Sequence, residues 1–293
     1  MLPRHGKSIR RRGKPSSGPS SLRLGAKAAT LKMHKYPRTP HLEGSRLQPG
    51  DEDLEQIPRS ALDGCHLVVA EKIDGANAGV SFTAQGELQL QSRGHYLTGG
   101  PRERQFAQLK SWAACHCEGL WRILGRRYVM FGEWVYAKHT IYYDQLPHFF
   151  LEFDLLDTDT GEFLDIDHRH GMLSGSPVVS VPVLARGRSE TLPPAAEMVT
   201  RARFKSPGWQ QGLRAEIAAR RLELEPVLAE TDPSDLAEGI YVKAEADGKV
   251  VGRFKWLRPS FRTTVANSAR SWLDRPLVPN ALRPGVDIYE PSR

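Results

Sequence analysis

Apolar residues in this chain recur mostly in short runs that end at polar turns, a pattern typical of β-strands. The apolar run at residues 67–70 is followed by Asp74-Gly75 and then by a second apolar run at residues 79–82. An Asp-Gly pair between two such runs predicts a tight turn joining two strands of a hairpin. Residues 87–93 alternate between apolar and polar with a period of two, which predicts a further strand.

The middle of the chain combines two strong strand signals with two helical ones. Residues 127–134 predict a strand, and residues 149–156 are apolar at nearly every position, as in a strand buried on both faces. Residues 101–124 predict a helix that ends at Gly125, and residues 210–224, rich in Ala, Leu, Glu and Arg, predict a second helix. The first helix is indicated by apolar residues at helical spacing, namely Phe106, Leu109, Trp112, Ala113 and Leu120.

The last clear unit is a hairpin that can be given a register from the sequence alone. Asp247-Gly248 separates two strand-like runs, at residues 237–245 and 249–256. If the turn has two residues, the numbers of directly paired positions sum to 495, so that Val242 faces Arg253.

This register decides which polar side chains share a face of the hairpin. Because side chains alternate along a strand, Glu238, Arg253 and Lys255 are expected on one face and Lys243 on the other. A three-residue loop with a bulge would reverse that assignment.

Composition indicates a globular chain with an unusual first segment. Of the 293 residues, 40% are hydrophobic and 26% are charged, and no run approaches the roughly 18 apolar residues of a membrane span, so we expect a soluble protein with no membrane partner. Residues 1–32 contain nine Lys or Arg and no acid; removing those nine charges from the net +7 leaves about −2 for the rest. Any nucleic-acid affinity of the body therefore needs a local patch.

The basic segment at residues 1–32 is expected to be disordered and has three interpretations. It could be a phosphate-seeking tail, an organellar transit peptide, or an untranslated stretch upstream of a true initiator at Met33. After it, we expect one catalytic domain at residues 33–265 and a short C-terminal tail at residues 266–293 that is too short to fold as a second domain.

The three cysteines favour a reducing compartment, and we expect the cytoplasm. Their odd number and spacing form no disulfide framework. Cys115-His116-Cys117 resembles half of a zinc site but lacks a second pair of ligands at suitable spacing.

The strongest candidate for chemistry is Lys72. It ends an apolar strand and is flanked by Glu71 and Asp74. A lysine there is expected to be partly desolvated, and a desolvated lysine can act as a nucleophile. Lowering its pKa by about 3 units requires roughly 4 kcal/mol of differential stabilisation, which desolvation and nearby cations could supply, the candidates being Arg253, Lys255 and a bound divalent metal.

Six short motifs in order then resemble the RNA ligase 2 branch of the covalent nucleotidyltransferases. Each string is common alone, but six in the family's order, each at a predicted strand or strand end, are specific. They span roughly residues 33–262 and comprise Lys72-Ile73-Asp74-Gly75 (motif I), Ser92-Arg93 (Ia), Phe131-Gly132-Glu133-Trp134 (III), Phe153-Asp154 (IIIa), Glu238-Gly239 with Lys243 (IV) and Arg253-Phe254-Lys255 (V).

The resemblance implies an α+β nucleotidyltransferase (ATP-grasp-like) fold, with antiparallel sheets and helices packed around a nucleotide cleft. It implies that Lys72 attacks the α-phosphate of ATP to give lysyl-AMP. Arg253 and Lys255 would neutralise the phosphate, and Glu238 would bind Mg²⁺ or Mn²⁺ or support its ligands. The family commonly has lysine where Arg253 stands, and arginine cannot serve as a titratable group there.

The remaining roles also follow from the resemblance. Glu71, Arg93, Glu133, Phe153 and Lys243 would contact the nucleotide, with Arg93 and Glu133 at the ribose and Phe153 stacked on the adenine. Asn77 matches the family position that contacts the RNA end. Each has a plainer interpretation: Phe153 as core, and Arg93 and Glu133 as polar strand ends.

The expected activity is ATP-dependent joining of RNA 3′-hydroxyl and 5′-phosphate ends, on RNA ends or a nicked duplex. One alternative is a DNA or mixed-strand ligase or another adenylyltransferase. A further alternative is a non-catalytic nucleic-acid-binding protein built on a ligase core. The sequence indicates no protein partner.

Overall fold

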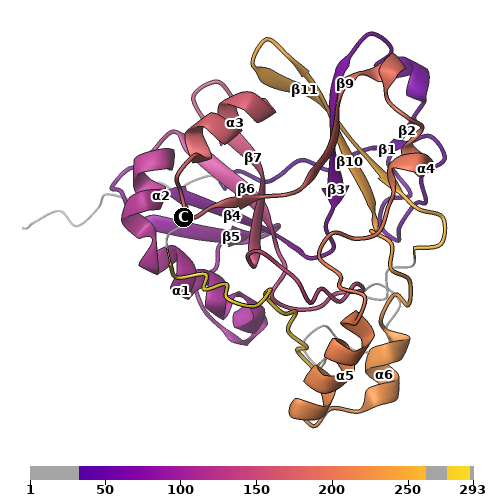
Figure 1. Cartoon of the computed structure of the whole chain (residues 1–293). Helices are drawn as coiled ribbons and strands as arrows, with labels where there is room; N and C mark the ends of the chain where they lie inside the picture. Colours follow the sequence, from indigo (N-terminus) through magenta and orange to yellow (C-terminus); the bar gives the residue numbers. More distant parts are fainter. Residues whose placement is uncertain (1–32, 262–275, 291–293) are drawn as a thin grey trace, which may run out of the picture. The chain divides into compact units, whose positions relative to one another are not determined.

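The structure is a computed structural model that describes residues 33–261 and 276–290 of the chain (Figure 1). The basic segment at residues 1–32, with its three interpretations, lies outside the described residues, and so do residues 262–275. Met33–Arg293 forms a compact unit of its own. No helix in the two described ranges is long and apolar enough to cross a membrane.

One of the two sheets carries the predicted C-terminal hairpin at its centre. Its six strands lie in the order β2-β1-β11-β10-β3-β9, and the four long ones are antiparallel. Only the two-residue strands at one edge pair in parallel. The strands are β1 (His41–Leu42), β2 (Gln56–Ile57), β3 (His66–Lys72), β9 (Val183–Arg188), β10 (Gly239–Ala246) and β11 (Lys249–Leu257).

The second sheet holds the two central strands that the sequence predicts. Its order is β5-β4-β6-β7-β8, with strands β4 (Ala76–Phe82), β5 (Leu88–Ser92), β6 (Tyr128–Trp134), β7 (Phe150–Asp157) and β8 (Val179–Ser180). Strand β7 is buried at all but one position, which confirms the prediction of a strand covered on both faces. Two antiparallel-rich sheets with helices confirm the α+β class.

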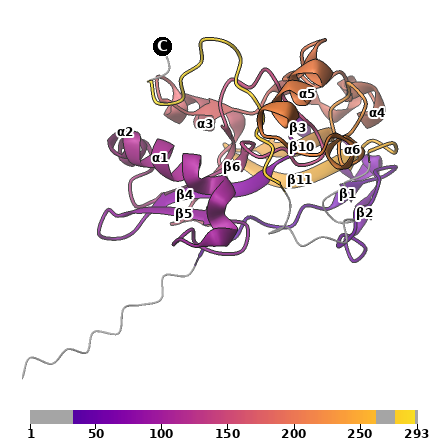
Figure 2. The same cartoon turned by 90° about the horizontal axis from the view of Figure 1, so that it is seen from below.

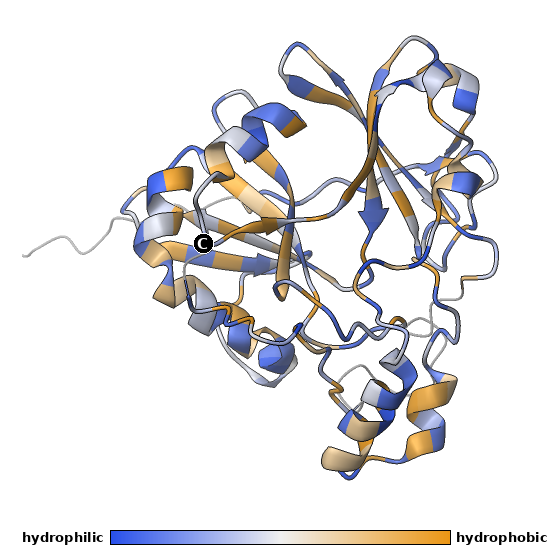
Figure 3. Cartoon of the chain, in the orientation of Figure 1, coloured by the Kyte–Doolittle hydropathy of each residue, from blue (hydrophilic) through white to orange (hydrophobic). Residues whose placement is uncertain are grey.

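The helices bury one side against the rest of the unit and leave the other to solvent. Helices α1 (Ala107–Cys115) and α2 (Cys117–Leu124) lie against the second sheet (Figure 1), where the Trp112 ring stacks on Phe150 at 5.4 Å between centroids. Figure 3 shows both hydrophobic and hydrophilic residues along α5 and α6. The other helical elements are η1 (Arg59–Leu62), η2 (Pro101–Phe106), α3 (Ile166–Leu173), η3 (Ser189–Thr191), α4 (Ala195–Met198), α5 (Trp209–Ala219) and α6 (Leu224–Ala229).

Two predicted helices are shorter than expected. The helix predicted at residues 101–124 is a 3₁₀ turn followed by α1 and α2, with a break at His116. Gly125 ends α2 as predicted, with φ of 49° and its N–H bonded to the Trp121 carbonyl. The helix predicted at residues 210–224 ends at Ala219, because Arg221 adopts φ of 55°, which a right-handed helix cannot contain.

The first predicted hairpin is wrong. Strands β3 and β4 belong to different sheets: β3 lies between β10 and β9, and β4 lies between β5 and β6. Both hydrogen-bonding edges of each strand are therefore occupied. Asp74-Gly75 instead carries the chain from one sheet to the other. A Cβ at Gly75 would lie 2.7 Å from the Val135 side chain and 2.8 Å from the Trp134 carbonyl oxygen, so the crossover requires glycine.

The C-terminal hairpin forms at the predicted turn but in a different register. Asp247 and Gly248 both have positive φ, as a two-residue turn of type I′ requires. A bulge between Ala244 and Glu245 then shifts the pairing by one residue, so that Lys243 faces Arg253. The predicted faces are therefore wrong, because a slip of one residue turns every side chain over.

Residues 276–290, expected as part of a short tail, pack against the segments around β6 within this unit (Figure 2, yellow). Pro279 and Leu282 form isolated β-bridges with Ala137 and Leu146. Asn280, 3% exposed, donates from Nδ2 to the Val135 carbonyl and accepts the Tyr143 N–H at Oδ1, over 2.7 and 2.8 Å.

Candidate active site

A cavity of about 580 Å³ gathers residues from both sheets and contains nearly all the predicted site residues. They enter it from strands that are far apart in the sequence. Arg253 is not among the cavity-lining residues of the described chain. Those from the predicted set are Glu71, Lys72, Asn77, Arg93, Glu133, Phe153, Glu238, Lys243 and Lys255.

Lys72 and Glu238 form the central pair of this cavity. Lys72 Nζ donates to Glu238 Oε2 over 2.8 Å; the lysine side chain is 23% exposed and the glutamate 2%. Gly239, which follows Glu238, pairs with Lys72 across the ladder. A Cβ at Gly239 would lie 2.0 Å from the Trp256 carbonyl oxygen, so only glycine lets the strand pass there.

The charge state of Lys72 differs from the sequence expectation. Burial alone would lower its pKa, but the negative charges of Glu238, Glu133 and Asp74 outweigh burial and raise it. The lowered pKa expected for Lys72 is therefore not found in the protein without nucleotide and metal, and the effect of a bound divalent cation stays a prediction. Lys255, the nearest predicted cation, is itself paired with Asp51.

The carboxylic acids around Lys72 hold protons more tightly than usual. Burial, with the nearby charges of Glu238 and Asp74, raises the pKa of Glu133 to about 8 although Lys72 opposes it. Burial likewise raises the pKa of Glu238 to about 7. The cavity thus contains more acidic groups than Lys72 can neutralise, an environment that favours an added cation.

Asp74, in the motif that contains Lys72, has a structural role in addition to its charge. Its Oδ2 accepts the backbone N–H groups of Thr140 and Ile141, each over 2.7 Å, and its own N–H donates to the Tyr143 hydroxyl over 3.0 Å. The motif is thereby tied to the segment that carries His139, which also lines the cavity.

Glu71, the residue before Lys72, is held by a backbone group from a distant segment. Its carboxylate accepts the backbone N–H of Arg203 at 3.2 Å, and burial raises its pKa to about 7. Arg203 lies 132 positions away in the sequence, and no sequence pattern indicated it.

At the end of the cavity lined by Tyr36, Phe153 and Tyr241, polar contacts connect the two sheets. Buried Asp154 accepts from Lys243 Nζ over 2.7 Å and from the Tyr36 hydroxyl over 2.5 Å. Lys243 also donates to the Phe153 carbonyl, and burial lowers its pKa to about 8. Phe153 is a partly buried member of the aromatic cluster around Tyr36.

Arg253 lies beside this end rather than next to Lys72. Its Nε is 3.4 Å from Asp154, and its guanidinium carbon lies 3.7 Å from the Phe163 ring centroid. Both contacts fix the arginine between the sheets. Its predicted contact with the α-phosphate stays a prediction, and this position does not support it.

The side of the cavity that contains Asn77, Arg93 and Glu133 is built from neighbouring strands. Asn77 on β4 pairs directly with Glu133 on β6, and Ala78 next to it pairs with Ser92 on β5, which precedes Arg93. The Asn77 Oδ1 is buried with no hydrogen-bond partner in the described chain. A buried acceptor in this state favours binding of a ligand that donates a hydrogen bond.

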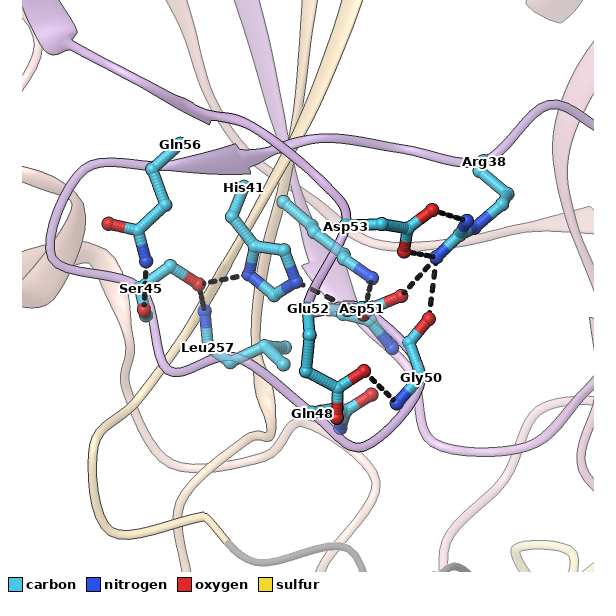
Figure 4. A network of polar contacts seen from close by, with 12 residues as sticks. Arg38, His41, Ser45, Gln48, Gly50, Asp51, Glu52, Asp53, Gln56 and Leu257 are labelled. Carbon is cyan, nitrogen blue, oxygen red and sulfur yellow. Dashed lines mark hydrogen bonds and ion pairs between the residues drawn. The ribbon is translucent and has the colours of Figure 1, made fainter.

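The connection between β1 and β2, residues 43–55, contributes contacts that the sequence did not indicate. Asp51 Oδ2 accepts from Lys255 Nζ over 2.5 Å and from His41 Nε2 over 3.1 Å. Gln48 Nε2 donates to Glu238 Oε1 over 3.3 Å. Figure 4 shows Asp51 between His41 and Arg38 at the centre of this network.

The acidic groups suit a divalent cation that arrives with a nucleotide. In residues 33–261 and 276–290, no group of three or more His, Cys, Asp or Glu side chains is placed to hold a metal ion. Mg²⁺ usually takes one or two protein carboxylates and completes its shell with water and substrate phosphates. Glu238, with its raised pKa and its place beside Lys72, fits that limited role.

Comparisons with solved structures give distant similarities. Naegleria gruberi RNA ligase with pyrophosphate is 17% identical over 77% of this chain and 56% of its own, with a TM-score of 0.45. A variant of that ligase with AMP and Mn is 16% identical over 77% of this chain and 56% of its own, with a TM-score of 0.46. An archaeal ATP-dependent RNA ligase is 14% identical over 77% of this chain and 48% of its own, with a TM-score of 0.42. The chain spans about half the length of the solved proteins it matches. No curated protein matches it.

The sequence family described as RNA ligase matches residues 66–257, from the first residue of β3 to the last residue of β11. This is more than half of the chain, and it includes the cavity pair Lys72 and Glu238 together with Lys255. The chain therefore belongs to the RNA ligase family.

Proposed function

We propose that this protein is an ATP-dependent RNA ligase that joins 3′-hydroxyl and 5′-phosphate ends through a covalent Lys72–AMP intermediate. The observation that carries the proposal is the pairing of Lys72 with buried Glu238 at 2.8 Å, in a cavity that also contains Lys255. A nucleophilic amine, a carboxylate and a cation in one cavity are the groups that nucleotidyl transfer requires.

In the first step the Lys72 amine forms a bond to the α-phosphorus of ATP, and the bond to the bridging oxygen breaks to release pyrophosphate. Lys72 must give up a proton to become a nucleophile. Glu238 accepts a hydrogen bond from the Lys72 ammonium in the protein without nucleotide, and a cation bound to Glu238 would loosen this pair, lower the pKa of Lys72 and let the proton pass to solvent. Lys255 supplies positive charge to the phosphate.

A divalent cation, when bound, would neutralise charge on the phosphates and weaken the hold of Glu238 on the Lys72 proton. Solved Naegleria gruberi ligase variants contain ATP and Mn or AMP and Mn, which supports ATP with Mg²⁺ or Mn²⁺ as the cofactors here. Glu238 is the residue we assign to the cation.

The other cavity residues fit the roles implied by the family. Phe153 would stack on the adenine, a contact worth about 1–3 kcal/mol, while Arg93 and Glu133 hold the ribose. The Glu71 region would read the base edge, and Lys243 would contact the nucleotide. Asn77, with its buried unpaired acceptor, would contact the RNA end. Arg253 is the least supported, given its contacts with Asp154 and Phe163.

The proposal is tested with labelled ATP and Mg²⁺. The wild-type protein should form a covalent adduct that nicked RNA discharges, and Lys72→Ala should form none. Lys249→Ala, which removes an exposed lysine paired with Glu162 at the surface, is the matched control and should label normally.

Other outcomes select the alternatives. Discharge by nicked DNA alone indicates a DNA or mixed-strand ligase. An adduct that no nucleic-acid end discharges indicates a different adenylyl acceptor. If the wild type forms no adduct with any nucleotide, the chain is a binding protein on a ligase core.

The cysteines support a reducing location, which we propose to be the cytoplasm. Cys65, Cys115 and Cys117 are all free thiols, and Cys115 is exposed. An exposed free thiol persists where the surroundings keep it reduced. RNA ends or a nicked duplex are the partners that this function needs.

A further inference from the structure

Lys255 is held by a relay of side chains that lies outside all six sequence motifs. Its Nζ donates to Asp51 Oδ2 over 2.5 Å, and both side chains are largely buried, at 12% and 16% exposure. Lys255 also lines the cavity that contains Lys72. The position of Asp51 therefore affects how the cation is presented to a bound phosphate.

The relay continues from Asp51 to the backbone of Lys255's own strand. His41, fully buried, places Nε2 3.1 Å from Asp51 Oδ2 and Nδ1 2.7 Å from Ser45 Oγ (Figure 4). Ser45 Oγ in turn accepts the N–H of Leu257 over 2.9 Å. Each member of the relay thus has a partner on both sides.

The direction of the hydrogen bonds follows from these partners. A carboxylate can only accept, so His41 donates from Nε2 to Asp51. Burial lowers the pKa of His41, which favours the neutral ring, and its Nδ1 then accepts the Ser45 hydroxyl proton. This arrangement fixes the ring, as in other sites where a histidine is oriented by its second nitrogen. It leaves Asp51 ionised among three donors: the His41 imidazole, the Lys255 ammonium and, 3.5 Å from Oδ1, the Arg38 guanidinium.

We propose that Asp51, fixed by His41 and Ser45, is a positioning residue that keeps the Lys255 ammonium protonated and directed into the cavity during transfer of the nucleotide to Lys72. The inference rests on the proposed function and deepens it. Asp51 itself does not line the cavity in the described chain; it acts through Lys255.

The electrostatics agree with this role. Burial lowers the pKa of Lys255 and so does the charge of Lys72, whereas the hydrogen bond and charge of Asp51 raise it. Without Asp51, Lys255 would lose its proton at lower pH. The titratable and charged groups that face Lys255 are Asp51 on the β1–β2 connection, His41 on β1, Tyr241 on β10, Lys72 on β3 and Glu238 before β10.

The test compares two charge-neutralising substitutions in one loop, Asp51→Asn and Glu55→Gln. Glu55 is exposed, whereas Asp53 shares Arg38 with Asp51, so Glu55→Gln is the matched control. Single-turnover formation of the Lys72 adduct is measured against ATP concentration and pH. The amplitude of adduct formation reports the fraction of folded molecules. The rate constant describes only those folded molecules, so partial unfolding of a variant does not change it.

We expect Asp51→Asn to lower the rate constant at saturating ATP by about 10- to 100-fold and to move the alkaline limb of its pH profile to lower pH. Glu55→Gln should match the wild type in both respects. A lowered amplitude with an unchanged rate constant and limb would show a merely structural role and overturn the inference. A faster Asp51→Asn would show that the carboxylate competes with phosphate, which also overturns it. If the wild type forms no adduct, the proposed function fails and this inference fails with it.

Discussion

Glu133 shows how a buried acid in this cavity makes the stability of the fold depend on pH. Its pKa is raised to about 8, mainly by burial, so the folded protein keeps a proton there that the unfolded chain releases near pH 4.5. Between these two values the native state binds more protons than the unfolded state. The free energy of unfolding therefore falls as pH rises through this interval, by at most about 1.4 kcal/mol per pH unit for one group.

Glu133→Gln should reduce this slope. From pH 7 to pH 8 Glu133 contributes most of the fall, because Glu71 and Glu238, with folded pKa values of about 7, add less, and Lys205 and Lys243, with folded pKa values of about 8, oppose it. Comparing the variant with the wild type therefore isolates Glu133. Urea unfolding without nucleotide should show stability decreasing from pH 7 to 8 in the wild type and in exposed Glu197→Gln, and a flatter profile in Glu133→Gln. Equal slopes in all three proteins would contradict the assignment.

At the scale of single elements, the C-terminal hairpin shows what a local pattern can predict. The turn was predictable, because Asp-Gly favours the positive φ that Asp247 and Gly248 adopt. The register was not, because the bulge between Ala244 and Glu245 leaves the alternation of β11 looking regular. Its consequence is that Lys243 shares a face with Lys255 and lines the cavity, which the predicted register denied.

Because sequence patterns are local, they could identify only some of the site residues. The motif residues lie in consecutive strings, so Lys72, Glu133 and Glu238 could be identified by spacing and order. Asp51 and Arg203 reach the site from segments 204 and 132 positions away from their partners. Such contacts depend on tertiary packing, which leaves no periodic signal in either segment.

Asp154 connects the two sheets through ion pairs with Lys243 and Arg253, which face each other in the observed hairpin register. It is fully buried on β7 and accepts from Lys243 on β10. Asp154→Asn keeps the shape but leaves Lys243 and Arg253 buried without a counter-charge. We expect a loss of about 3 kcal/mol or more in the free energy of unfolding, measured in urea at pH 7.

The control removes a salt bridge of the same chemistry at the surface. Glu162→Gln takes away the partner of Lys249, and both of those side chains are more than a third exposed. An exposed pair of this kind contributes about 0–1 kcal/mol. A loss in Asp154→Asn no greater than in Glu162→Gln would show that the sheets do not depend on this charge.

At the scale of the whole unit, the cavity depends on chain that lies beyond the family match. The match ends at Leu257, yet residues 276–290 pack beside β6 and the segment that follows it. Asn280 Oδ1 accepts the N–H of Tyr143, and the Tyr143 hydroxyl accepts the N–H of Asp74, two residues after Lys72. Two hydrogen bonds thus link the C-terminal segment to the motif that carries Lys72.

Asn280→Ala tests this link. The substitution leaves the Tyr143 N–H and the Val135 carbonyl buried and unpaired, so we expect a loss of about 2–4 kcal/mol in urea unfolding together with slower formation of the Lys72 adduct. Tyr289→Phe is the control within the same segment; that side chain is 38% exposed and loses only its bond to Gln108, so its stability should change by less than about 0.5 kcal/mol. If Asn280→Ala is as stable and as fast as Tyr289→Phe, the C-terminal segment does not support the site, and Tyr143 holds Asp74 without it.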